Sequence, residues 1–387
     1  MWQRNVTMGI VAASSAAALF VLHQLFLRKY KKAIDEDDDQ RVQFQIQIVD
    51  LSTYLGTKND DDGCRKIADA LHRYGIVICR DPRVSAKDND RYLDMMETYF
   101  ALSDGVRDAR PEYSYQVGVT PSRTERPRNH CSRKGSLGPN DQPLSPCPPE
   151  LDPKWRFFWR IGPLPPFPTQ FPALNMDPVI PPEIPRWKEV MDTWGNKLLE
   201  CLQTTAEMAA IGFDMPLDSF TSRMQYGPHL LAPTGSDYST FDKEGTVLAG
   251  YHYDLNFLTI HGKSRYPGLY IWTRSGRREA VLVPEGCLLI QAGRQLEILT
   301  GGHVLAGFHE VVISQETCKV IEQRKREGKS LWRVSSTLFG HVQSDQVLRP
   351  LPPFDANHSA KASFAPMLAG DQVTAELRAI ALDKTQQ

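Results

Sequence analysis

The sequence of 387 residues lacks any excess of charge, since 45 basic and 46 acidic residues give a formal net charge of −1. A nucleic-acid-binding protein usually carries a basic excess, so this balance argues against a nucleic-acid partner. There is also no internal repeat and no CxxC pair. Its seven cysteines are scattered and odd in number, which argues against a zinc ribbon or a disulfide framework. We predict reduced, mostly buried thiols, as in a reducing compartment.

Long apolar runs are rare, and the one exception lies near the N-terminus. Residues 8–27 carry no formal charge and, as a helix, would span a bilayer core of about 30 Å. A membrane anchor, a cleaved signal peptide and an organelle presequence are the competing interpretations. Basic residues at 28–32 follow the run and favour an anchor at 1–34, with the folded part in the cytosol. An organelle-targeted soluble enzyme is the alternative, and residues 35–42 are predicted to be an acidic spacer.

The region 43–186 begins with regular elements and ends in irregular chain. Its pattern predicts a strand leading into a turn at 43–54, a helix at 64–75, a buried strand at 76–81 and a second helix at 86–103. Residues 120–186 hold a large share of the 28 prolines and several basic residues. We expect loops here that lie over the mouth of the domain.

The region 187–387 predicts a mainly β domain with flanking helices. Residues 187–212 have the apolar spacing of an amphipathic helix, and 369–382 predict a closing helix. Between 219 and 342 the sequence consists of short β-type runs separated by turns, including 219–227 and 296–302. Many short strands at near-regular spacing are typical of a sandwich or a barrel.

Within this β region, His252 and Asp254 lie two residues apart, so on a strand their side chains share one face. A third ligand would complete a facial triad of two histidines and one carboxylate, which leaves metal positions open. Five histidines follow the pair. His309 opens a strand-like run and is the preferred third ligand, whereas His261, at an odd offset, would face the other side of a continuous strand.

These residues resemble the core of the iron(II)- and 2-oxoglutarate-dependent oxygenase superfamily, in its isopenicillin N synthase-like branch. The family pattern is HxD, a distal His and RxS, which here are His252–Tyr253–Asp254, His309 and Arg333–Val334–Ser335. The segments PGLYIW at 267–272 and GRQLEILTGG at 293–302 also resemble family motifs. The likeness spans most of the chain after residue 45.

The resemblance implies a double-stranded β-helix (jelly-roll, cupin-like) core at 187–387, preceded by an α/β oxygenase region at 43–186. It implies Fe(II) on His252, Asp254 and His309, with 2-oxoglutarate and dioxygen as co-substrates. Arg333 and Ser335 would bind the distal carboxylate of 2-oxoglutarate, because a guanidinium can grip a carboxylate at two points. The expected outcome is hydroxylation of a small organic molecule.

The sequence departs from the family pattern at one co-substrate contact. The stretch expected to supply a Tyr contact is Gln225–Tyr226–Gly227, with Gly227 at the Tyr position, so Gln225 or Tyr226 would substitute. A 2-oxoglutarate-independent oxidase of the isopenicillin N synthase type is therefore one alternative, and a non-catalytic membrane-tethered module is another. The charged segment 316–329 is predicted to be a surface helix between strands, and loops at 110–175 are expected to select the substrate. The oligomeric state stays open.

Overall fold

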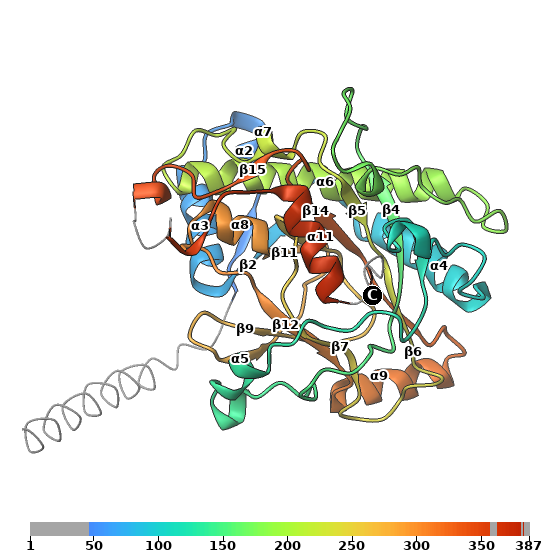
Figure 1. Cartoon of the computed structure of the whole chain (residues 1–387). Helices are drawn as coiled ribbons and strands as arrows, with labels where there is room; N and C mark the ends of the chain where they lie inside the picture. Colours follow the sequence, from blue (N-terminus) through green and yellow to red (C-terminus); the bar gives the residue numbers. More distant parts are fainter. Residues whose placement is uncertain (1–45, 357–361, 381, 383–387) are drawn as a thin grey trace, which may run out of the picture. The chain divides into compact units, whose positions relative to one another are not determined.

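The computed structural model describes residues 46–356, 362–380 and 382 (Figure 1). The predicted membrane anchor at 1–34 and the acidic spacer at 35–42 lie outside the described residues. No helix in the described part of the chain is both long enough and apolar enough to cross a membrane.

The largest sheet has ten strands. Its order is β1-β2-β11-β8-β14-β5-β4-β6-β13, and β3 pairs with β4 off this path. The strands are β1 (Ile48–Asp50), β2 (Ile76–Arg80), β3 (Gly118–Thr120), β4 (Trp155–Ile161), β5 (His229–Leu231), β6 (Thr234–Asp237), β8 (Leu258–His261), β11 (Leu288–Ala292), β13 (Trp332–Ser335) and β14 (Thr337–Gly340). Strands from 43–186 and from 187–387 therefore share one sheet.

A smaller sheet has four strands in the order β10-β9-β12-β7. These are β7 (Val247–His252), β9 (Leu269–Trp272), β10 (Arg278–Ala280) and β12 (Phe308–Val312). A separate pair consists of β15 (Val347–Leu348) and β16 (Met367–Leu368). The described fold is thus sheet-rich, as the sequence predicted.

Helices surround the sheets. The α-helices are α2 (Ser52–Thr57), α3 (Asp61–Tyr74), α4 (Ala86–Leu102), α5 (Cys131–Gly135), α6 (Trp187–Gly212), α7 (Thr221–Met224), α8 (Arg294–Leu299), α9 (Gln315–Arg326) and α11 (Ala369–Ala379). Short 3-10 helices are η1 (Pro111–Tyr113), η2 (Pro139–Asp141), η3 (Pro172–Leu174) and η4 (Phe354–Ala356). The predicted helices at 64–75, 86–103, 187–212, 316–329 and 369–382 correspond to α3, α4, α6, α9 and α11.

Two short runs that the sequence predicted as strands are helical. The run 219–227 contains α7, and 296–302 overlaps α8. Short apolar runs fit a strand and a buried helical turn equally well, so periodicity cannot separate them. By contrast, α4 begins with a capping box in which Ser85 and Asp88 satisfy each other's backbone N–H groups.

Strand β4 corrects the prediction that 120–186 is only loops, because it lies within the ten-stranded sheet. Its alternate residues face opposite sides. Phe157 and Trp159 face α6: the Phe157 ring lies 4.8 Å from that of Trp187, and the Trp159 Nε1 donates to Asp192 at 2.8 Å. In Figure 1, α6 runs along the top of the described fold.

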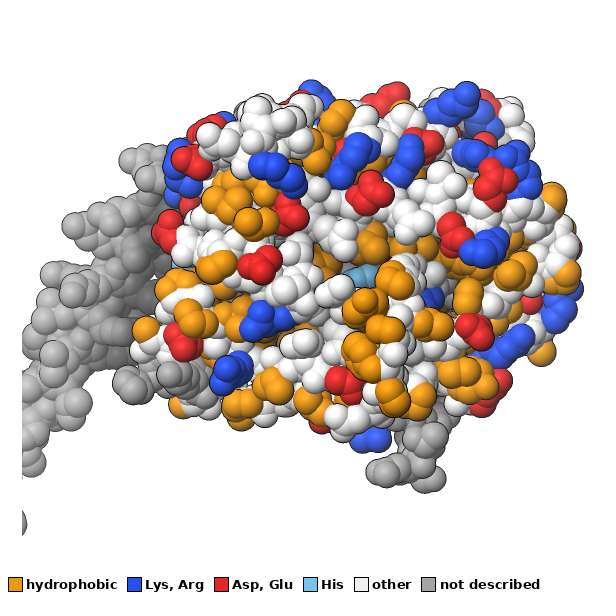
Figure 2. Space-filling view, turned by 90° about the horizontal axis from the view of Figure 1, so that it is seen from above, with side chains coloured by type: hydrophobic (Ala, Val, Ile, Leu, Met, Phe, Trp, Pro, Cys, Tyr) orange, Lys and Arg blue, Asp and Glu red, His pale blue; other side chains and the backbone are white. Residues whose placement is uncertain are grey.

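The other side of the ten-stranded sheet faces the four-stranded sheet. A cavity of about 440 Å³ has walls from both, with Arg333 and Ser335 on the ten-stranded side and His252 and His309 on the four-stranded side. We call it the Arg333 cavity. On the face shown in Figure 2, acidic and basic side chains are interspersed, and apolar side chains surround a small area of histidine surface.

Candidate metal centre

Three side chains predicted as metal ligands come together at the end of the four-stranded sheet. His252 ends β7 and lies directly opposite His309 of β12 in the antiparallel register. Asp254 follows two residues beyond the end of β7. Its Oδ1 lies 3.8 Å from the His252 Nε2 and 3.9 Å from the His309 Nε2, and one ligand atom from each residue lies within 4.8 Å of the others.

Neighbouring groups aim the three ligand atoms at a common point. The His252 Nδ1 lies 2.5 Å from the carbonyl oxygen of Gly250, which leaves Nε2 free to bind a metal. The His309 Nδ1 lies 3.2 Å from the carbonyl oxygen of Gly307, which likewise leaves Nε2 free. The Thr259 hydroxyl donates to the Asp254 Oδ2 at 2.6 Å, so Oδ1 is the oxygen that faces the histidines.

Burial favours the neutral form of His252, which is the form that binds a metal cation. Desolvation, together with the neighbouring His309, holds the pKa of His252 well below its ordinary value. The imidazole is therefore neutral near pH 7, as metal binding requires. Two imidazoles and one carboxylate without a thiolate are the donor set of non-haem iron(II) sites with open positions.

A buried cation, Arg333, lines the same cavity as the metal-ligand cluster. Arg333 is 5% exposed, and its Nε has no hydrogen-bond partner. Burial lowers the pKa of its guanidinium. No carboxylate of the described residues pairs with it, so the guanidinium presents a positive charge that a carboxylate of a small ligand could neutralise. Ser335 lies on the same strand face and lines the same cavity.

The known proteins that this chain resembles include oxygenases. No family model matches it. A 2-oxoglutarate-dependent dioxygenase from Gibberella zeae is 25% identical over 329 residues, which cover 79% of this chain and 78% of the relative. Kihadalactone A synthase LFS from Citrus sinensis is 24% identical over 214 residues, which cover 52% of this chain and 57% of that protein.

Solved structures share the fold. A 2OG-Fe(II) oxygenase family protein from Caulobacter crescentus matches with a TM-score of 0.64 at 23% identity, over 86% of this chain and 98% of that one. Neurospora crassa T7H, solved in complex with alpha-KG, matches with a TM-score of 0.66 at 15% identity, over 88% and 98% of the two chains. These relatives and the His–Asp–His cluster decide the family. The chain is a 2-oxoglutarate- and iron(II)-dependent oxygenase.

In this oxygenase, the two residues predicted to replace the family Tyr contact lie elsewhere. Gln225 caps the end of α7, and Tyr226 packs against Phe167, so neither lines the Arg333 cavity. Strand pairing instead places Ser236 opposite Arg333 and Thr234 opposite Ser335, and both line the cavity. No local sequence pattern indicates that Thr234 and Ser236 lie here, since about 100 residues separate the two strands.

His261 also lines the Arg333 cavity, contrary to the prediction that it faces away from the metal residues. The prediction assumed one continuous strand, but β7 ends at His252 and β8 begins at Leu258, so the alternation is interrupted. The His261 Nδ1 lies 3.0 Å from the Thr337 hydroxyl, and its Nε2 has no partner. Burial lowers the pKa of His261 to about 4, so the ring is neutral.

A second cavity meets the first at His252 and Asp254. We call it the α11 cavity, because the C-terminal helix and the residues after it form one wall. Its apolar lining residues are Phe158, Leu230, Leu255, Phe339, Leu377, Ile380 and Leu382. At its edge, the Arg128 Nη1 lies 2.7 Å from the Glu376 Oε1, and the Tyr253 hydroxyl donates to the same oxygen at 2.9 Å.

Three buried charges and the partly buried Arg156 lie beside the point where the cavities meet. The Lys154 Nζ lies 2.8 Å from the Glu125 Oε1 and 2.5 Å from the Asp152 Oδ2. The Arg156 Nη1 lies 2.8 Å from the Glu125 Oε2. Each of these two cations therefore has an acidic partner, as buried charges require.

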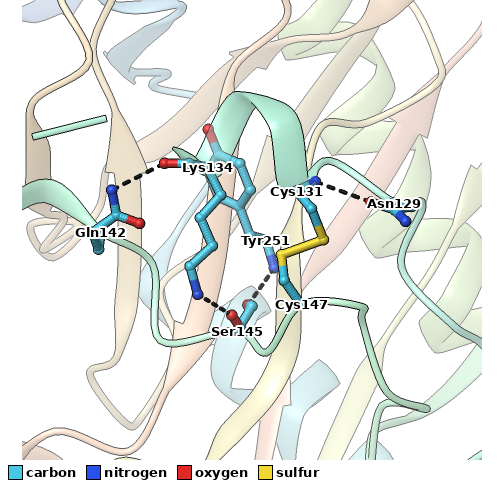
Figure 3. The surroundings of a disulfide bond; sticks show 7 residues. All are labelled: Asn129, Cys131, Lys134, Gln142, Ser145, Cys147 and Tyr251. Atoms are coloured by element: carbon cyan, nitrogen blue, oxygen red, sulfur yellow. Dashed lines mark hydrogen bonds between the residues drawn. A yellow bond between two sulfur atoms is a disulfide. The ribbon is translucent and has the colours of Figure 1, made fainter. Parts of the chain in front are cut away.

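The prediction that the cysteines are all reduced is wrong for one pair. Cys131 and Cys147 form a disulfide with a Cα–Cα distance of 5.6 Å (Figure 3). The segment between them is bound to β7 through Ser145, whose hydroxyl accepts from the backbone N–H of Tyr251 at 2.6 Å. Four of the other five cysteines are buried free thiols, as predicted.

Proposed function

We propose that this oxygenase uses Fe(II), 2-oxoglutarate and dioxygen to hydroxylate a C–H bond of a small organic substrate. One observation supports the proposal above others: a His–Asp–His cluster and a buried arginine without an acidic partner line the same cavity. A redox-inactive metal site would need no such arginine. A co-substrate with a metal-binding keto-acid end and a distal carboxylate needs both features.

We assign each of these residues a role in the proposed function. His252, Asp254 and His309 hold the metal, and Thr259 fixes the orientation of the carboxylate. Arg333 and Ser335 bind the distal carboxylate, with Thr234 and Ser236 beside them. Bound iron would supply the oxidising chemistry, in which one atom of dioxygen enters the succinate formed from 2-oxoglutarate with loss of CO₂, and the other enters the hydroxylated substrate. The apolar walls of the α11 cavity limit access of water to the reacting C–H bond.

Anaerobic spectroscopy tests the metal and the co-substrate together. Adding Fe(II) and 2-oxoglutarate to the protein should give a visible charge-transfer band, and His252→Ala should abolish it. Admitting dioxygen should then convert 2-oxoglutarate to succinate. Iron binding that 2-oxoglutarate leaves unaffected would favour the 2-oxoglutarate-independent oxidase, and absence of iron binding would contradict both.

The branch of the oxygenase superfamily and the type of β core are further parts of the same proposal. The order HxD, distal His and RxS supports the isopenicillin N synthase-like branch, and the two facing sheets support a double-stranded β-helix core. A sequence comparison restricted to residues 252–335 would test the branch. Grouping of this segment with another branch would overturn it.

A membrane anchor at 1–34 is a separate proposal, supported by the uncharged run at 8–27 and the basic residues after it. Fusing residues 1–34 to a fluorescent reporter and extracting the membranes with alkaline carbonate tests it. An integral anchor stays in the pellet. Release into the supernatant, or cleavage of the segment on import into an organelle, would contradict it.

A further inference from the structure

A buried arginine other than Arg333, namely Arg160, lies close to the α11 cavity. The inference drawn from Arg160 rests on the proposed function. Arg160 lies on β4 directly opposite Leu230 of β5, and Leu230 in turn lies opposite Phe339 of β14. Residues that are directly opposite in neighbouring antiparallel strands share one face of the sheet. Leu230 and Phe339 line the α11 cavity, and Arg160 shares their face of the sheet without itself being one of the lining residues.

Arg160 is buried and lacks an acidic partner. It is 7% exposed, and its one hydrogen bond runs from Nη2 to the carbonyl oxygen of Pro163 at 2.9 Å. Its Nε and Nη1 have no partner within the part of the chain that the structure describes. Burial lowers the pKa of Arg160 to about 10, which leaves the guanidinium charged near pH 7.

The ionisable groups around Arg160 are basic. Burial, followed by the charge of Arg160, lowers the pKa of His229 to about 3, and burial with both neighbours has the same effect on His341. Both rings are therefore neutral. His229 is fully engaged, because its Nε2 lies 3.1 Å from the carbonyl oxygen of Met224 and its Nδ1 accepts from the N–H of His341. The His341 Nδ1 has no partner, and His341 lines the α11 cavity.

The cluster thus has one net positive charge and unused hydrogen-bonding atoms beside the α11 cavity. A single carboxylate matches this charge, whereas a phosphate dianion would exceed it. Leu255, Leu377, Ile380 and Leu382 also line the cavity and would contact an apolar group. The metal residues His252 and Asp254 lie at the junction with the Arg333 cavity, where a C–H bond of such a molecule would meet the oxidant.

We propose that Arg160 and His341 bind the carboxylate of the substrate, and that the substrate is a monocarboxylic acid with an apolar body. The oxygenase then uses two buried arginines in parallel. Arg333 takes the distal carboxylate of the co-substrate in one cavity, and Arg160 takes the carboxylate of the substrate in the other.

Calorimetry on the anaerobic Fe(II)–2-oxoglutarate complex tests the proposal with matched probes. The probes are butanoate, octanoate and phenylacetate, together with the primary amide of each, which keeps the shape and removes the charge. At least one acid should bind about 10- to 100-fold more tightly than its amide. In Arg160→Gln that preference should disappear, while the iron–2-oxoglutarate band remains.

Stability separates ligand binding from a structural role. Because Arg160 has no acidic partner, Arg160→Gln and Arg160→Met should melt at or above the temperature of the ligand-free wild type. The exposed Arg326→Gln serves as the control and should keep the preference for acids. Equal binding of acid and amide, no binding of any acid, tighter binding of octyl phosphate than of octanoate, or a lower melting temperature in both Arg160 variants would overturn the proposal. Absence of the band in the wild type would instead overturn the proposed function.

Discussion

Arg156 and Arg333 line the same cavity from strands of the same sheet, and β6 separates those strands. Their surroundings differ. Arg156 is paired with Glu125 at 2.8 Å, within a network that also neutralises Lys154. Arg333 is more deeply buried than Arg156, and no carboxylate of the described residues pairs with it. A buried cation with an acidic partner is satisfied by the fold itself, whereas one without a partner marks the position of an anionic ligand.

Substitution of a metal residue should have the largest effect on activity, because the proposed reaction depends on the metal. Asp254→Ala removes the single carboxylate from the cluster and should abolish Fe(II) retention after dialysis, measured as iron per protein. The exposed Asp69→Ala is the control and should retain iron. Full iron content in Asp254→Ala would show that the metal is bound elsewhere.

The paired arginine should be sensitive to loss of its partner. Glu125→Gln leaves Arg156 without its acidic partner and Lys154 with Asp152 alone. We expect a loss of about 3–5 kcal/mol in the free energy of unfolding, since an uncompensated charge would stay buried. Urea denaturation measures it, and the exposed Glu322→Gln should cost less than about 0.5 kcal/mol. A small loss in Glu125→Gln would remove the distinction between the two arginines.

An exposed ion pair should contribute much less to the free energy of unfolding. Arg128 is 46% exposed where it meets Glu376 at the edge of the α11 cavity. Solvent screens such pairs, so Arg128→Gln should lower the free energy of unfolding by about 0.2–1 kcal/mol. The same denaturation experiment measures this effect, and a loss as large as that of Glu125→Gln would show that exposure does not set the difference.

The unpaired arginine should contribute nothing to stability without its ligand. Arg333→Gln removes a buried charge that has no acidic partner, so the ligand-free protein should melt at the wild-type temperature or above it. Differential scanning calorimetry checks this result. A clear decrease in melting temperature would mean that Arg333 supports the fold.

Residues in short motifs could be predicted from the sequence. His252 and Asp254 are two apart, and Arg333 and Ser335 are two apart, so each pair is positioned by local geometry. The structure brings His309 to the first pair through the register of β7 and β12. The long helices α4 and α6 were predictable because their apolar spacing persists over several turns.

Residues placed by long-range pairing could not be predicted. Ser236 faces Arg333, and Arg160 faces Leu230, only because strands distant in sequence pair in a particular register. The break between β7 and β8 that redirects His261 has no periodic signal. Similarly, Cys131 begins the short helix α5 and Cys147 lies in irregular chain, and their spacing does not reveal a pairing.

The most direct test of the central claim is calorimetric titration of 2-oxoglutarate into anaerobic, Fe(II)-loaded wild type and Arg333→Gln. If Arg333 marks the co-substrate site, the wild type binds one equivalent, and the variant binds about 10- to 150-fold more weakly with unchanged iron content. Equal affinity in the two proteins would contradict the claim, because the unpaired arginine would then have no part in binding 2-oxoglutarate.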